Sequence, residues 1–121
     1  MVLAICGCRT AERLTVVADS VAIRYVATEV SATMRTDKEL IVTLTNPDSV
    51  RLLGQRGRLA VGQLARLAYR AYGDSFAVRQ VRIRLIRSAE MHPLKVTHVM
   101  LDTLLLRWQL EEARPVSRLP Q

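Results

Sequence analysis

The ten residues "VRQVRIRLIR", numbers 78–87, decide the fold of this chain. Every second residue from Val81 to Leu85 is aliphatic, and the two residues between them, Arg82 and Arg84, are cationic. Successive side chains of a β-strand point to opposite faces of a sheet, so this alternation predicts a strand with one buried and one solvated face. A sheet of this kind needs a layer that covers only its apolar face.

Three other segments predict further strands. The run "LIVTLT", residues 40–45, is the clearest of them, and Asn46-Pro47-Asp48 ends it. Residues 94–101 are expected to form a further strand after a loop at residues 88–93. Residues 21–34 are rich in β-branched side chains and favour a strand, although an apolar spacing from Leu14 to Tyr25 also fits a helix. That segment is therefore open between the two, and residues 9–19 before it read as a tether or a first turn.

The region between the strands predicts one main helix, over about 51–72. Its apolar residues recur at three- and four-residue spacing, which places them on one face: Leu53, Ala60, Leu64, Leu67, Ala68 and Ala71. Gly73 follows at the position that commonly ends a helix, and glycines near the start weaken the first turns.

This order of elements predicts an α+β fold. We expect an antiparallel sheet of about four strands, in the order β-β-α-β-β, with the main helix packed on one face. A short C-terminal helix is expected over 104–113, capped by Asp102 or Thr103. A single domain would then span residues 9–113, followed by a tail at 114–121.

Composition narrows the choice of function. The net charge is +7, and all of the 18 basic residues except Lys38 and Lys95 are arginine. Such a balance suits anionic partners, although arginine richness also follows from a GC-rich genome. Aromatic residues make up only 4%, which argues against a base-stacking surface. No apolar stretch approaches the length of about 18–20 residues that spans a bilayer.

The N-terminal stretch "ICGC", residues 5–8, resembles the lipobox of bacterial lipoproteins, with Cys8 as the lipidated residue and Cys6 as the weaker choice. Residues 1–8 would then be a truncated leader, since seven uncharged residues are too few for a complete one. With "VTLTN" before the helix and an arginine-rich strand after it, the chain resembles small uncharacterised bacterial lipoproteins. The alternatives are a buried strand over residues 2–6 and a redox or metal role for the two cysteines.

Arginines form the most informative surface feature of the sequence. Six of them fall on the main helix and on the strand that follows it: Arg66, Arg70, Arg79, Arg82, Arg84 and Arg87. A joined basic surface would meet an anionic lipid surface, an acidic protein partner or nucleic acid. The alternative is a solvated face without a partner.

The C-terminal stretch predicts a docking surface. Leu105, Trp108 and Leu110 belong to an apolar cluster that does not fit one helical face, so part of it should be exposed. The alternative is that the cluster covers the edge of the sheet.

No pattern indicates catalysis, a cofactor or a metal. His92 and His98 are separated by Pro93, and no carboxylate pair lies near them. We therefore expect a non-enzymatic, lipoprotein-like accessory subunit, anchored at the membrane and facing the periplasm. It would dock on a larger membrane complex, for which a respiratory or photosynthetic complex is a candidate. A cytosolic basic nucleic-acid-binding protein is the alternative, and an enzyme with a non-locally assembled site is a third reading.

Overall fold

The computed structural model describes residues 2–47, 57–91 and 93–111, and it shows the expected α+β fold. The elements in chain order are α1 (Val2–Arg24), β1 (Glu29–Met34), β2 (Glu39–Thr45), α3 (Gly57–Tyr72), a 3-10 turn η1 (Ser75–Ala77), β3 (Gln80–Met91), β4 (Leu94–Leu106) and α4 (Arg107–Glu111). The expected sequence of two strands, a main helix and two strands is confirmed.

The four strands form one sheet in the order β1-β2-β3-β4. The two outer pairs are antiparallel hairpins, but the central pair, β2 and β3, is parallel. The sheet is therefore mixed and mostly antiparallel, where we expected antiparallel pairing throughout. The reason is the connection: a helical crossover returns the chain to the end of the sheet where the previous strand began.

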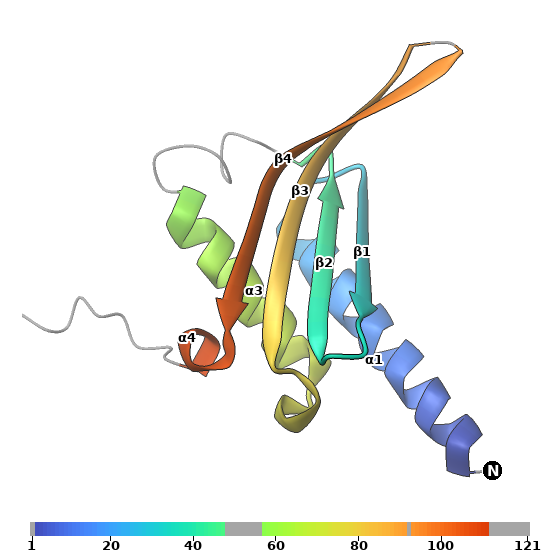
Figure 1. The fold of residues 1–121 in the computed structure, drawn as a ribbon, viewed down its shortest axis with the longest axis vertical. Helices are drawn as coiled ribbons and strands as arrows, with labels where there is room; N and C mark the ends of the chain where they lie inside the picture. Colours follow the sequence, from blue (N-terminus) through green and yellow to red (C-terminus); the bar gives the residue numbers. More distant parts are fainter. Residues whose placement is uncertain (1, 48–56, 92, 112–121) are drawn as a thin grey trace, which may run out of the picture.

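Both long helices, α1 and α3, cover the same face of the sheet (Figure 1). The strands turn aliphatic side chains toward them, and the alternation of β3 is as predicted: Val81, Ile83 and Leu85 are fully buried, and Arg82 and Arg84 point to the other face. Leu40, Val42 and Leu44 of β2 complete the sheet's share of the core. No helix of the described residues lies on the opposite face of the sheet (Figure 1).

Helix α1 is the main departure from expectation. It runs without interruption to Arg24, so the tether expected at residues 9–19 and the alternative of a strand at residues 2–6 are both wrong. The strand expected at residues 21–34 is confirmed only for its second half. The helical spacing prevails in the first half because it places Val17 and Val21, both fully buried, in the core.

Helix α3 agrees with the sequence from Gly57 to Tyr72, while residues 51–56 lie outside the described part. Its end is fixed by Gly73, whose φ of 80° favours glycine. A side chain there would also meet Arg13, whose Nη1 would lie 2.9 Å from an added Cβ. Arg13 donates from this nitrogen to the Tyr72 carbonyl at 2.7 Å, which ties α1 to the C-terminal end of α3.

The β3–β4 hairpin is longer than expected and projects beyond the other two strands (Figure 1). Strand β4 continues to Leu106, so residues 104–106 are not helical, and the expected C-terminal helix is reduced to α4. The tail expected at 114–121 lies outside the described residues.

Candidate functional site

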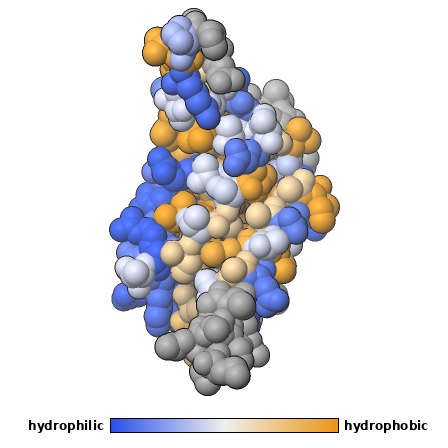
Figure 2. Space-filling model, turned by 90° about the vertical axis from the view of Figure 1, so that its right-hand side faces the viewer, coloured by the Kyte–Doolittle hydropathy of each residue, from blue (hydrophilic) through white to orange (hydrophobic). Residues whose placement is uncertain are grey.

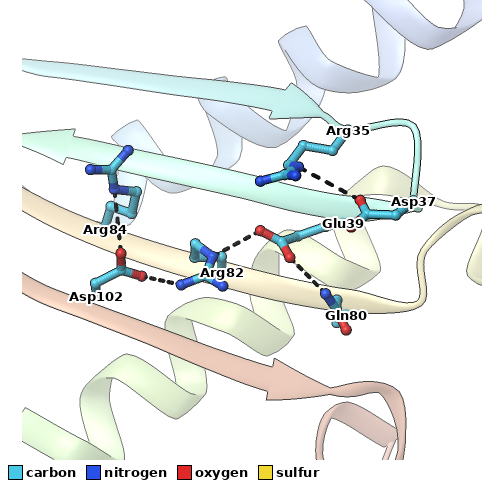
Figure 3. A network of polar contacts seen from close by, with 7 residues as sticks. All are labelled: Arg35, Asp37, Glu39, Gln80, Arg82, Arg84 and Asp102. Atoms are coloured by element: carbon cyan, nitrogen blue, oxygen red, sulfur yellow. Dashed lines mark hydrogen bonds and ion pairs between the residues drawn. The ribbon is translucent and has the colours of Figure 1, made fainter.

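A network of charged side chains lies on the helix-free face of the sheet (Figure 3). Arg82 is its centre: its Nε donates to Glu39 Oε2 at 2.8 Å, and its Nη1 donates to Asp102 Oδ1 at 2.6 Å. Gln80 Nε2 donates to the other oxygen of Glu39 at 2.6 Å. Arg84 lies against Asp102 with a separation of 3.7 Å between Nε and Oδ2. The residues meet because the register places Glu39 beside Gln80 and Arg84 beside Asp102.

The network holds Glu39 in its charged form. Its side chain is only 3% exposed, and burial alone would raise the pKa of this carboxyl. Hydrogen bonds from Arg82 and Gln80, with the positive charges of Arg82 and Arg35, outweigh burial and lower the pKa below its ordinary value. The same bonds to Glu39 and Asp102 raise the pKa of the Arg82 guanidinium.

This pairing corrects the expectation of one joined basic surface. The charges of Arg82 and Arg84 are opposed by Glu39 and Asp102 across neighbouring strands. Sequence alternation showed that both arginines share a face, but it could not show which carboxylates the adjacent strands bring to them.

The other four arginines are also dispersed. Arg66 and Arg70 belong to α3, which lies on the opposite side of the sheet from Arg82 and Arg84. Arg79 and Arg87 are exposed near opposite ends of the part of β3 that pairs with β2. The six residues therefore do not form one surface.

Of the three expected docking residues, only Trp108 stands out from the domain. Its exposed fraction is 62%, whereas Leu110 is buried at 1%. Leu105 is half-buried and packs against the core from the helix side of β4. The physical reason is that α4 packs against α3 and turns Leu110 into the core, and the Tyr69 hydroxyl of α3 donates to Glu111 of α4 at 2.8 Å.

A second cluster of cations contains Arg79, which the sequence singled out, and two residues that it did not. Lys38, Arg79 and Arg107, which we call the cationic end, meet where the β1–β2 turn, the start of β3 and the end of β4 come together. They line an open hollow of about 390 Å³ with Thr36 and Asp37. A neighbouring hollow of about 680 Å³ shares some of these residues and adds Gln80, Leu106, Trp108 and Glu111. The only sequence signal is the placement of each cation at a strand terminus.

The remaining surface is mixed. Figure 2 shows apolar side chains lying between hydrophilic ones on the side turned to the viewer, with the most hydrophilic side chains gathered on one flank of the lower half. Exposed aliphatic residues are scattered over the molecule, among them Val16 and Ile23 of α1 and Leu94 of the hairpin. We find no broad apolar face among these residues.

Cys6 and Cys8 both lie on the N-terminal part of α1. Within residues 2–47, 57–91 and 93–111, no group of three or more His, Cys, Asp or Glu side chains could hold a metal ion. His92 is not among these residues. None of the helices in the described part of the chain is long and apolar enough to cross a membrane. Comparison of the chain with protein-family models, with curated proteins and with solved structures found no match.

Proposed function

We propose that this protein is a non-enzymatic accessory subunit of a bacterial membrane assembly. In this proposal it is anchored through lipid on Cys8, faces the periplasm, and docks on a larger protein complex through the surface around Trp108. The observation that carries the proposal is the exposure of Trp108 beside the half-exposed Leu106, at the mouth of an open hollow. Exposed tryptophans in such positions often anchor protein interfaces.

The course of α1 supports the anchor. Its C-terminal half packs on the domain through Val17 and Val21, while its N-terminal part runs past the end of the sheet (Figure 1). A mature chain that begins at Cys8 would keep the packed half. Lipid on Cys8 would then stand away from the core, where it can enter a bilayer without disturbing the fold.

The charged groups of the open face support a non-enzymatic role. Glu39, Arg82 and Asp102 bond to one another, so their charges stabilise the sheet and are not directed at an open cavity. The dispersal of the six arginines gives the nucleic-acid alternative less support than the sequence did.

Docking is tested in native membranes with Trp108→Ala. We expect the wild-type protein, after mild solubilisation, to migrate in native electrophoresis with an assembly far larger than its own 13.6 kDa. Trp108→Ala should migrate alone, with a melting temperature close to that of the wild type because the side chain is largely exposed. Leu94→Ala, which removes another exposed apolar side chain, is the matched control and should stay in the assembly. Docking is wrong if Trp108→Ala stays there as well.

Anchoring is tested separately by intact-mass analysis of the membrane-derived protein. We expect a chain that begins at Cys8 and carries acyl groups, and we expect a high-salt wash to remove more of Cys8→Ser than of the wild type from the membrane fraction. An unmodified mass that includes residues 1–7 would overturn the anchor, and it would leave the test of Trp108 unaffected.

A further inference from the structure

The main chains of the three residues of the cationic end are hydrogen-bonded in series. The Arg79 amide donates to the Lys38 carbonyl at 2.8 Å, and the Arg107 amide donates to the Arg79 carbonyl at 3.1 Å. These bonds place three cationic residues next to one another, although they come from segments that are distant in sequence. Lys38 is held at the tip of its turn with a φ of 66°, and its amide donates to the Arg35 carbonyl at 3.0 Å.

The cationic end keeps its charge. Among the described residues, no carboxylate forms an ion pair with Lys38, Arg79 or Arg107. The acid nearest in the hollow, Asp37, lies 3.7 Å from Arg35, which opposes its charge. Arg107 is oriented by the Val78 carbonyl, which accepts from its Nε at 3.1 Å and from its Nη2 at 2.9 Å.

The other acids of this region are also engaged. Asp74 accepts from the Phe76 amide at 3.2 Å, and Glu111 accepts from the Tyr69 hydroxyl. These bonds come from neutral donors and leave both acids charged, but the hollow of about 390 Å³ is lined by three cations against the single carboxylate of Asp37. An excess of positive charge therefore remains at this hollow, where it would attract an anionic surface.

Two aromatic side chains project from the same end of the molecule. Phe76 of η1 is 82% exposed, the highest value for any aromatic residue described, and Trp108 follows the last strand. The cap that Asp74 forms on η1 holds the Phe76 backbone in place. Exposed aromatic residues beside cations are typical of surfaces that lie at the membrane–water interface.

The position of α1 indicates which way this end faces. The β1–β2 turn, η1 and α4 all lie at the lower end of the molecule in Figure 1, and the N-terminal part of α1 runs past that same end. The β3–β4 hairpin projects at the opposite end. A lipid on Cys8 would therefore bring the cationic end, and not the hairpin, to the bilayer.

We propose that the cationic end binds the phosphate groups of anionic phospholipids and lays this end of the domain on the bilayer. Lys38, Arg79 and Arg107 contact the headgroups, and Phe76 enters the interfacial layer. The inference builds on the proposed function for the orientation of the domain. Headgroup binding itself needs neither the lipid on Cys8 nor a protein partner.

The test uses the full 121-residue chain without lipid on Cys8. Its flotation is measured with vesicles of phosphatidylcholine alone and with vesicles that also contain phosphatidylglycerol. We expect binding only to the anionic vesicles, with loss of binding at high salt. Arg79→Gln should weaken binding by about fivefold, and adding Lys38→Gln should weaken it by about 25-fold, since each basic residue near an anionic surface contributes about 1 kcal/mol.

Arg87→Gln is the matched control. It removes the same charge from an exposed position on β3, the strand that Arg79 precedes, but far from the cationic end, and should leave binding nearly unchanged. Phe76→Ser should weaken binding without any change in net charge.

Four outcomes would overturn the inference. These are no binding to anionic vesicles, no preference for anionic vesicles over phosphatidylcholine, an equal loss with Arg87→Gln and Arg79→Gln, and tighter binding to duplex DNA through the same residues. The last would favour the nucleic-acid alternative. Failure here leaves the docking test intact, because that test follows the migration of Trp108→Ala in the native assembly and does not depend on vesicle binding.

Discussion

At the scale of single residues, Glu39 is the group whose chemistry depends most on the fold. Its carboxylate is nearly buried, and the bonds from Arg82 and Gln80 hold its pKa below the ordinary value of about 4.5. A lowered pKa in the folded state stabilises the protein above the unfolded pKa, and this contribution is lost as the pH falls through the folded pKa. Glu39→Gln should therefore lower the free energy of unfolding by about 2 kcal/mol at pH 7.

The pH dependence distinguishes this effect from a simple packing loss. Denaturant unfolding at pH 7 and at successively lower pH should show the difference between wild type and Glu39→Gln shrinking below about pH 4.5. Asp37→Asn is the control, because its ion pair with Arg35 is exposed and should contribute little at any pH. A difference that stays constant down to acid pH would show that charge is not its source.

Residue patterns predicted the face of each β3 side chain but not its partners. The alternation from Val81 to Leu85 depends only on the two-residue period of a strand, and it is confirmed. The pairing of Arg82 with Glu39 and Asp102 depends on the order and register of three strands. In the sequence, Arg82 is 43 residues from Glu39 and 20 residues from Asp102. No local pattern contains that information, which is why the arginines read as a free basic stripe.

At the scale of elements, α1 shows how two periodicities compete. Residues 21–34 are rich in β-branched side chains, yet the first part is helical because Val17 and Val21 lie four residues apart on the face that meets α3 and the sheet. Burial of that face outweighs the β propensity of individual residues. The second part, from Glu29, forms a strand because it pairs with β2.

Helix α1 should therefore be an integral part of the domain. Val17→Ala removes a fully buried side chain and should lower the free energy of unfolding by about 2 kcal/mol. Val16→Ala, at the adjacent and half-exposed position, is the matched control. It should lower the free energy of unfolding by only a few tenths of the amount expected for Val17→Ala. Equal effects in thermal or denaturant unfolding would show that α1 does not pack as described.

At the scale of the whole molecule, stability is distributed unevenly along the long axis. The lower part of the sheet is covered by two helices, and its two central strands carry six fully buried residues. The Asn46 side chain bonds to the amide and the carbonyl of Ser88. Beyond Ser88 the described residues of the hairpin pair only with one another, and Leu94 and Val96 are exposed there. A two-stranded ribbon without a covering layer has little independent stability in water.

Native-state hydrogen exchange should reveal this gradient. We expect the amides of Leu40–Leu44 and Val81–Leu85 to exchange only through global unfolding, since each lies in a strand paired on both sides beneath the helices. The hydrogen-bonded amides of the ribbon, within residues 89–91 and 94–97, should exchange at least about a hundredfold faster, because opening the ribbon exposes few buried side chains. Leu94→Ala should leave the slow amides unchanged. Slow exchange throughout the hairpin of the isolated chain would mean that something covers it in solution, and the gradient inferred from burial would then be wrong.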